Sequence, residues 1–534
     1  MSVIYDYFHR AATRFPDKLA LVDGEDTYTY AQLLAQIETL ACKIIDKSGQ
    51  QRPRVALITD NQKDNICTCL AIAKLNGCCI PMNGQLLPAQ LIRACQAVDA
   101  NILAGSAGAI QKTAQAEHAI ATIDLSAVDL SAVDFSAIWQ NDNETSPSNS
   151  QISTELEARI ASWQGAQDFL ITLSSGSTGA PKPIMISQQV KLERAKQSWE
   201  LYHLTERDVS LCASPFFHSL GQRLTFVPLL LGCTMVHLSK FTPSQWLNLV
   251  EQYQVSFVIS VSSHLYALKK QLIANAKQLT SLDTIVTSSA PIDAKFKAQV
   301  FNAIGCDFHE IYGATEIAVA TNLSPAQASA KYQTVGSACN NIDLVILDDE
   351  YNEVTNNTVG EIAVRTPLAF SGYYQQQALT QQSFHNEYFL TGDLGKKDAD
   401  GFLSYVGRKK DIIISGGINI YPKDIESVLL QHSAIHEIAV IGVEDTLLGE
   451  VIVAICIAEP NTIESNKIES ELRKLANKQL AAFQRPLKYF FPDELPLTAT
   501  GKVSKLMLRE QYSKLNDGWT DSLRMMLYGG SADD

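Results

Sequence analysis

The chain has 534 residues, of which 46% are hydrophobic and 19% are charged, and its formal net charge is −14. This composition is that of an ordinary globular protein, so it excludes a fibre, a wholly disordered chain and a small disulfide-stabilised scaffold. The negative charge argues against a protein that binds nucleic acid or an anionic membrane through a broad positive field.

The amino-terminal segment MSVIYDYFHR lacks the basic and apolar regions of a secretory signal. The most apolar stretch, residues 226–235, is too short to cross a bilayer and contains Pro228 and Gly232. The 11 cysteines include no CxxC pair, which favours reduced, buried thiols over a zinc or disulfide site. We therefore expect a cytoplasmic protein with no membrane span and no nucleic-acid partner.

The first hundred residues alternate between strand-like and helix-like patterns. Residues 26–30 and 55–58 predict strands, and residues 31–45 and 66–75 predict helices from the spacing of their apolar side chains. This alternation is typical of a protein built from α/β layers.

The composition changes between about residues 105 and 150. Three five-residue units, DLSAV, DLSAV and DFSAI, fill residues 124–138 and precede the polar segment NDNETSPSNS. Because this repeat is too short for a solenoid, we interpret it as a surface insertion or loop.

The α/β pattern resumes at Asp168 and continues to about residue 405, where the basic stretch GRKKD precedes a new strand, loop and helix pattern. This restart predicts a second, smaller domain. The tail after about residue 516 is rich in Gly, Asp and Ser, so we expect it to fray.

The segment LSSGSTGAPK, residues 173–182, follows the apolar run at residues 169–171 and is expected to form a loop that leaves a strand. Its glycines let the backbone approach an anion, and its hydroxyls and lysine can bind phosphate oxygens. The spacing is not that of a Walker A loop, and a flexible loop without a ligand is the alternative. The candidate phosphate-binding residues are Ser174, Ser175, Gly176, Ser177, Thr178, Gly179 and Lys182.

With five further segments, this loop resembles the adenylate-forming superfamily of acyl-CoA synthetases, luciferases and peptide-synthetase adenylation domains. The segments, in the order of the family motifs, are SSGSTGAPK (174–182), IYGATE (311–316), GEIAVRTPLAFSGY (360–373), TGD (391–393), GRKKDIIISGGINIYPKDIE (407–426) and PLTATGKVSK (496–505). The resemblance implies an α/β fold with a large amino-terminal domain of layered sheets and helices, residues 1–408, and a smaller, mobile α+β carboxy-terminal domain, residues 409–534. It also implies an active site between them.

The resemblance implies roles for residues in these motifs. Thr315 and Glu316 would hold the α-phosphate and Mg²⁺, since a carboxylate beside a hydroxyl suits a hard cation. Lys410 marks the hinge, and Lys502 would bridge the acid carboxylate and ATP. The remaining nucleotide contacts implied are Ser289, Ala290, Pro291, Tyr312 and Gly313 at the adenine, and Asp393 and Arg408 at the ribose.

Residues near position 218 resemble the entrance to the acyl pocket. His218 occupies the gate position, and Ser219 stands where amino-acid-activating relatives carry Asp, so an α-amino acid is disfavoured relative to a fatty or aromatic acid. Arg223 would share a helix face with Ser219 and meet a second carboxylate or polar group of the substrate, or turn outward to a carboxylate of the protein. The segment that begins at Ser288 resembles a family segment that is usually richer in Gly, so the bulkier serine would shorten the acyl pocket.

The segment SGGINIYP, residues 415–422, resembles CoA ligases, in which Gly416 and Gly417 would let a pantetheine arm pass. The activity implied is ATP-dependent activation of a small-molecule carboxylic acid, fatty or aryl, followed by transfer to CoA, with ATP, Mg²⁺ and CoA required. The main alternative is a stand-alone enzyme that loads the phosphopantetheine of a separate acyl or peptidyl carrier protein. Two others are a degenerate nucleotide-binding member, which the retained Lys502 and Glu316 disfavour, and a luciferase-like oxygenase, which no feature supports.

Overall fold

The structure is a computed structural model, and it describes residues 2–49, 51–114, 120–126, 168–174, 182–276, 279–288, 292–445, 447–459, 465–497, 503–515 and 519. The predicted insertion starts inside the fold, since Asp124 ends the strand Ala121–Asp124 and Leu125 is buried. Its remainder from residue 127 onward and the predicted frayed tail, apart from residue 519, lie outside the described residues. The chain forms two compact units, residues 1–343 with 365–389, and residues 344–364 with 390–534. This division does not test the predicted boundary after residue 408, which concerns motion, so that boundary stays a prediction.

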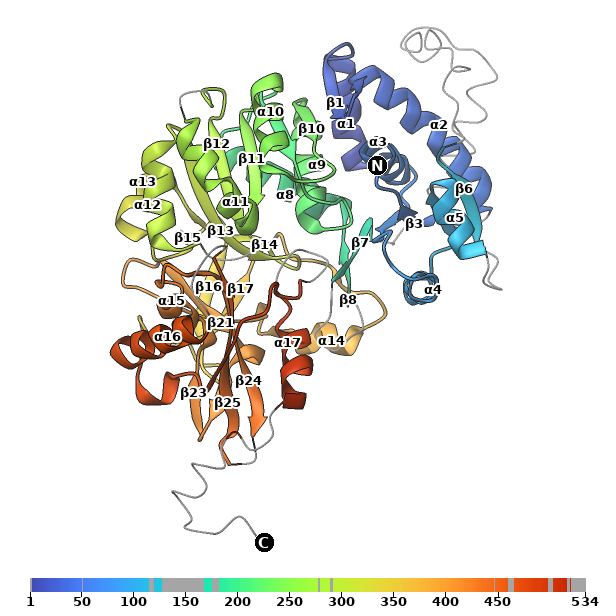
Figure 1. The fold of residues 1–534 in the computed structure, drawn as a ribbon. Helices are drawn as coiled ribbons and strands as arrows, with labels where there is room; N and C mark the ends of the chain where they lie inside the picture. Colours follow the sequence, from blue (N-terminus) through green and yellow to red (C-terminus); the bar gives the residue numbers. More distant parts are fainter. Residues whose placement is uncertain are drawn as a thin grey trace, which may run out of the picture. The chain divides into compact units, whose positions relative to one another are not determined.

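The first unit contains a nine-stranded sheet in the order β15-β14-β13-β12-β11-β9-β10-β1-β2. Figure 1 labels most of these strands. Its strands are β1 (Leu19–Asp23), β2 (Asp26–Thr29), β9 (Val209–Cys212), β10 (Thr234–His237), β11 (Phe257–Val261), β12 (Thr284–Ser288), β13 (Asp307–Ala314), β14 (Ala318–Leu323) and β15 (Ser337–Ala338). Neighbouring strands from β1 through β10, β9, β11 and β12 to β13 pair in parallel. The carboxyl ends of these strands therefore meet at one edge, where α/β sheets place their ligands.

A second sheet of this unit has the order β18-β8-β7-β4-β3-β5-β6. Its strands are β3 (Arg54–Ile58), β4 (Cys78–Pro81), β5 (Ile102–Gly105), β6 (Ala121–Asp124), β7 (Leu170–Ser174), β8 (Lys182–Ile186) and β18 (Gly372–Tyr373). β7 and β8 form an antiparallel pair, and β18 pairs with β8 so that Tyr373 lies opposite Ile184. This pairing places Tyr373 next to the strand that begins with Lys182.

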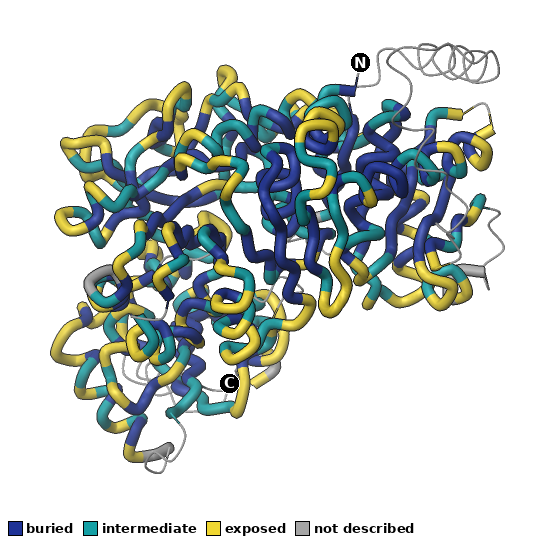
Figure 2. The backbone as a smooth tube through the Cα atoms, turned by 90° about the horizontal axis from the view of Figure 1, so that it is seen from above, coloured by how far each residue is buried: buried dark blue, intermediate teal, exposed yellow. Residues whose placement is uncertain are grey.

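Helices accompany both sheets. They are α1 (Val3–Arg14), α2 (Tyr30–Ser48), α3 (Gln62–Lys74), α4 (Pro88–Ala97), α5 (Ala107–Ala114), α8 (Gln188–Leu201), α9 (Ser219–Leu231), α10 (Pro243–Tyr253), α11 (Ser262–Ala274), α12 (Ala294–Ala303), α13 (Pro325–Lys331) and α14 (Gln377–Gln382). The strands are largely buried, and exposed residues gather on loops and outer helix faces (Figure 2). One core cluster includes Trp246, Phe296 and Phe308.

The four elements predicted in the first hundred residues are confirmed, but two helix boundaries differ, and α2 ends at Ser48 rather than at residue 45. The predicted helix at 66–75 begins earlier, at Gln62, because the Asn61 side chain accepts a hydrogen bond from the Asp64 N–H at 2.9 Å and caps the helix. The first turn of α3 consists of polar residues, so the spacing of apolar side chains does not predict it. All 11 cysteines are free, and most are buried, as predicted.

The second unit carries most of one five-stranded sheet and all of another. The first has the order β16-β17-β20-β19, with β21 on β20, and the other has the order β23-β22-β25-β24, with β26 on β25. The strands are β16 (Asp343–Leu347), β17 (Gly360–Arg365), β19 (Phe384–His385), β20 (Tyr388–Lys397), β21 (Leu403–Arg408), β22 (Ile413–Ser415), β23 (Ile418–Ile420), β24 (Ile435–Asp445), β25 (Gly449–Ala458) and β26 (Lys488–Phe490). The α-helices are α15 (Pro422–Leu429), α16 (Ser465–Gln479) and α17 (Lys505–Tyr512).

This architecture confirms the predicted fold class, an α/β protein with a large amino-terminal part and a smaller α+β part. Among the helices formed by the described residues, none combines the length and the apolar character needed to cross a bilayer.

His264, in α11, gives stability a predictable dependence on pH. Its ring stacks on Phe241 with centroids 3.7 Å apart, and burial lowers the pKa of His264 to about 4. The unfolded chain therefore binds a proton at this residue below about pH 6.5 while the folded chain does not, so stability falls as the pH falls toward 4. His264→Phe keeps an aromatic stack and removes the titration. We expect urea unfolding to show a smaller loss of stability between about pH 7 and pH 5 in the variant than in the wild type, and equal losses would contradict this.

Candidate active site

The predicted phosphate loop joins two paired strands. Ser174 ends β7, Lys182 begins β8, and the two residues are register partners. The Lys182 Nζ lies 5.2 Å from the centroid of the Tyr373 ring. The residues predicted to contact phosphate between them, Ser175, Gly176, Ser177, Thr178 and Gly179, lie outside the described residues, and so does the side chain of Ser174.

Thr315 and Glu316 follow β13 in the turn that leads to β14. The Tyr373 hydroxyl donates to Glu316 Oε1 at 3.0 Å, and the Thr315 hydroxyl donates to Ser219 Oγ at 3.3 Å. Burial and the neighbouring Glu316 charge raise the pKa of Tyr373, so its phenol stays protonated as a donor. The structure thus brings the predicted residues Lys182, Ser219, Thr315 and Glu316 around Tyr373 and the start of α9.

Gly313 is required by the strand pairing at this turn. A Cβ built on Gly313 would lie 1.8 Å from the Ala318 carbonyl oxygen, which a real side chain never tolerates. The glycine of the IYGATE motif therefore lets β14 approach β13 closely and fixes the turn that presents Thr315 and Glu316.

Arg194, on α8, holds the backbone of this turn and was missed by the sequence analysis. Its guanidinium donates to the carbonyl oxygens of Thr315 at 2.9 Å, Glu316 at 3.0 Å and Leu368 at 2.7 Å. Burial, together with the charge of Arg223, lowers the pKa of Arg194 to about 9. Its position in an ordinary helix outside every motif gave no signal of this role.

The other predicted residues of the first unit occupy strand ends and loops. Ser288 ends β12 beside β13, and its carbonyl accepts a hydrogen bond from the Ser262 hydroxyl at 3.2 Å. Tyr312 lies buried in β13, and its role in stacking on adenine stays a prediction. His218 precedes α9, its ring 4.2 Å from that of Phe217. Ser289, Ala290 and Pro291 lie outside the described residues.

In the second unit, the structure brings the predicted ribose-binding residues together. Asp393 and Arg408 are register partners on β20 and β21, and Arg408 Nε lies 3.0 Å from Asp393 Oδ1. The Asp393 side chain is 7% exposed and that of Arg408 is 49% exposed. The predicted hinge residue Lys410 is exposed in the 3-10 helix Lys409–Asp411, while neighbouring Lys409 pairs with Glu361 at 3.2 Å.

Gly416 and Gly417 form the turn between β22 and β23, with φ angles of +57° and +79°. Positive φ at both central residues of such a turn strongly favours glycine. A Cβ on Gly417 would meet nothing within 4 Å, so the local conformation alone accounts for the two glycines. Their predicted role beside pantetheine stays a prediction, and Lys502 lies outside the described residues.

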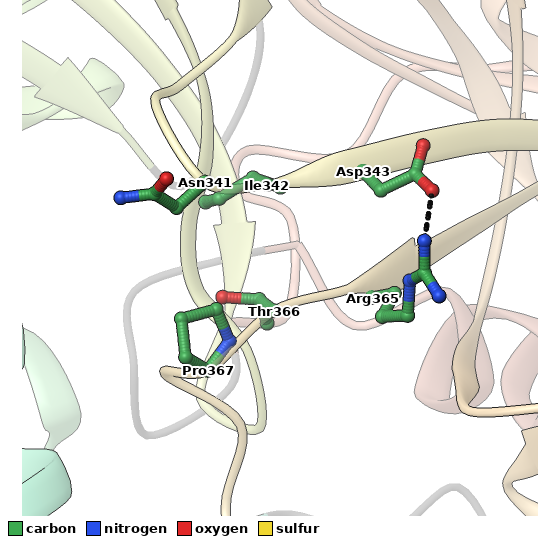
Figure 3. A pocket seen from close by; sticks show the side chains of 6 residues that line it. All are labelled: Asn341, Ile342, Asp343, Arg365, Thr366 and Pro367. Carbon is green, nitrogen blue, oxygen red and sulfur yellow. Dashed lines mark hydrogen bonds and ion pairs between the residues drawn. The ribbon is translucent and has the colours of Figure 1, made fainter.

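A hollow of about 510 Å³ lies elsewhere in the first unit. It is lined by Asn341, Ile342, Asp343, Arg365, Thr366 and Pro367, as Figure 3 shows. Its arginine is already neutralised, because Arg365 pairs with Asp343 at 2.8 Å and with Glu387 at 3.4 Å. None of the residues predicted to be functional lines this hollow.

Comparison with known proteins decides the family. Residues 8–374 match the AMP-binding enzyme family, and residues 424–502 match the AMP-binding enzyme C-terminal domain. The chain belongs to the AMP-binding enzyme family. The predicted family and enzyme class, a ligase of the adenylate-forming superfamily, are confirmed.

Named relatives cover nearly the whole of this AMP-binding enzyme. It is 29% identical to the indoleacetate–CoA ligase of Aromatoleum aromaticum over 95% of this chain and 97% of that protein. It is 26% identical to the medium-chain fatty-acid–CoA ligase of Escherichia coli over 95% of this chain and 89% of that protein. The crystal structure of ATP-bound MatB from Rhodopseudomonas palustris is similar with a TM-score of 0.80, at 25% identity, over 96% of this chain and 100% of that one.

Proposed function

We propose that this enzyme uses ATP to convert a carboxylic acid into an acyl-adenylate and then transfers the acyl group to the thiol of CoA. The observation that carries the proposal is the turn after β13, where Arg194 fixes the backbone and Tyr373 orients the Glu316 carboxylate. Support also comes from the end-to-end similarity to proteins named as CoA ligases.

In the first half-reaction, an oxygen of the acid carboxylate attacks the α-phosphorus of ATP and pyrophosphate leaves. Charge builds on the phosphate oxygens, so fixed donors and cations there stabilise the transition state. In this proposal the Thr315 hydroxyl acts on these oxygens from the turn after β13, and Lys182 acts on them from the start of β8. Arg194 and the strand pairing already hold these two residues in position, so the reaction requires little additional ordering of them.

The residues present fit a magnesium ion. Within the described residues no group of three or more His, Cys, Asp or Glu side chains is arranged to hold a metal. Mg²⁺ commonly uses one or two carboxylates together with substrate phosphates. Glu316, with the Thr315 hydroxyl beside it, offers this oxygen set, and the bound ion would neutralise charge on the phosphates.

The second unit contributes the ribose site and the lysine. Asp393 accepts hydrogen bonds from the ribose hydroxyls, and Arg408, which pairs with it, contacts the ribose and phosphates. Lys502 stabilises the carboxylate and phosphate charge during adenylation. In the second half-reaction, the CoA thiol attacks the acyl carbonyl and AMP leaves.

Acid-dependent exchange of labelled pyrophosphate into ATP tests the first half-reaction directly. We expect exchange that requires both Mg²⁺ and a carboxylic acid, because pyrophosphate re-enters ATP only from the acyl-adenylate. A full panel of fatty, aryl and dicarboxylic acids without exchange would contradict the proposal.

Asp393→Asn tests the ribose site. The variant keeps the shape of the side chain but leaves Arg408 without its carboxylate, and it replaces a charged acceptor of the ribose hydroxyls with a neutral one. We expect the KM for ATP to rise about 10-fold with a smaller change in kcat. Asp349→Asn is the matched control, because Asp349 is 85% exposed and pairs with Lys409 at the surface. An unchanged KM in Asp393→Asn would remove Asp393 from the site.

A further inference from the structure

Three basic residues gather on two adjoining helices next to the Thr315–Glu316 turn. Lys191 and Arg194 lie on α8 and are only 5% and 8% exposed. Arg223 lies on α9, which packs on α8, and is half-buried. None of the three forms an ion pair with an Asp or Glu within the described part of the chain.

The contacts of each residue show what compensates its charge. Lys191 Nζ lies 3.4 Å from Gln222 Oε1 and 5.0 Å from the centroid of the Phe226 ring. Arg194 is satisfied by main-chain carbonyls alone. Arg223 makes no hydrogen bond with any residue that the structure describes. Neutral dipoles and a ring face therefore stand where carboxylates normally neutralise buried cations.

Such an arrangement is costly unless a ligand completes it. Moving a cation out of water without an anion costs several kcal/mol. Burial lowers the pKa of all three residues, and the charges of Arg194 and Arg223 lower the pKa of Lys191 further. The charge of Glu316 opposes this shift at Arg194, so the positive potential inside the fold is only partly compensated. Residues with strongly shifted pKa values cluster at functional sites.

The position of the cluster indicates which ligand meets it. Ser219, the first residue of α9, accepts the hydrogen bond from Thr315, and Arg223 follows one helical turn later on the same face. Arg194 binds the backbone of Thr315 and Glu316 from α8. The three cations therefore approach this turn from α8 and α9. The predicted phosphate loop, in contrast, connects β7 and β8.

We infer that the acid activated by this enzyme is a dicarboxylic acid, of which one carboxylate is adenylated and the other stays ionised against Arg223 and Lys191. This inference rests on the proposed function. The planar guanidinium matches a carboxylate in geometry, and the ammonium adds a point charge. The same positive potential repels the ammonium of an amino acid, in agreement with Ser219 in place of an aspartate.

The first experiment compares the wild-type enzyme on matched acids, with ATP, Mg²⁺ and CoA. Each dicarboxylic acid from malonate to suberate is paired with the monocarboxylic acid of the same carbon number, and terephthalate is paired with benzoate. We expect one dicarboxylic acid to exceed its partner in kcat/KM by at least about 30-fold, and to give a thioester that keeps one free carboxylate. A preference for the monocarboxylic acid in every pair overturns the inference and leaves the proposed function standing.

Substitutions of Arg223 and Lys191 test whether these residues cause the preference for a dicarboxylic acid. We expect Arg223→Met and Lys191→Met to lower kcat/KM for the preferred diacid by at least about 30-fold, without lowering it for the matched monoacid. Arg223→Lys should recover part of the loss because it retains the charge. Lys196→Met is the control, since Lys196 lies on the same helix, is 33% exposed and pairs with Glu193. Losses that are equal for diacid and monoacid overturn the inference.

Folding and binding measurements separate the remaining outcomes. Arg223→Met removes a half-buried charge without a partner, so we expect an unfolding temperature equal to or above that of the wild type, whereas a structural arginine would lower it. If no acid yields adenylate or thioester, the proposed function fails, and calorimetric titration of the ligand-free protein with the same diacids decides the anion site. Binding to the wild type that Arg223→Met abolishes supports the site, and no binding overturns it.

Discussion

Glu316→Gln is expected to lower the rate of acyl-adenylate formation by at least about 100-fold. Glutamine preserves the shape of the side chain and can still accept the hydrogen bond that Tyr373 donates at 3.0 Å, so the turn after β13 should keep its geometry. The variant loses only the negative charge, which is what a magnesium ion on the ATP phosphates requires from this position. Pyrophosphate exchange as a function of Mg²⁺ concentration measures the effect, and higher Mg²⁺ should restore part of the rate.

Two further variants isolate the role of the Glu316 charge. Glu200→Gln changes an exposed glutamate of α8 and should leave exchange unaltered. Tyr373→Phe removes the hydrogen bond but keeps the carboxylate, so its effect should be smaller, at about 10-fold. An exchange rate in Glu316→Gln within about twofold of the wild type would exclude Glu316 from metal binding.

Lys502→Ala should separate the two half-reactions. We expect adenylation to fall by about 1,000-fold, because the ammonium is proposed to stabilise charge only while the carboxylate attacks the α-phosphorus. Thioester formation from a supplied acyl-adenylate and CoA should stay within a few-fold of the wild type. Lys478→Ala, at an exposed position of α16, is the control for a general loss of positive charge. Unchanged pyrophosphate release in Lys502→Ala would remove the lysine from the mechanism.

The family and the fold class were predictable because six short motifs occur in the same order as in the adenylate-forming superfamily. Each motif is weak alone, yet their order fixes which strands must end near one another. The register of β7 with β8 then places Lys182 at a strand end beside the predicted loop, as the sequence pattern predicted. The start of α3 was not predictable from apolar spacing because its first turn is polar and depends on the Asn61 cap.

Much of what surrounds the candidate site carries no sequence signal. Lys191 and Arg194 occupy a helix whose residues look like those of a solvated surface, and only the packing of α8 reveals that both are buried. Gly416 and Gly417 illustrate the opposite case, since a functional interpretation was available although the positive φ angles of the turn already require glycine. Local pattern identifies a residue type, whereas burial and the absence of a partner are properties of the assembled tertiary structure.

Mass spectrometry of the products formed from ATP, Mg²⁺, CoA and the panel of carboxylic acids tests the central claim most directly. The account predicts AMP, pyrophosphate and one acyl-CoA, in equal amounts and from a single class of acid. Acyl-adenylate and pyrophosphate without any acyl-CoA would contradict CoA as the acceptor and direct the search to a separate carrier protein. ATP consumption that yields ADP, or no acid-dependent product at all, would contradict the assignment as an AMP-forming acid–CoA ligase.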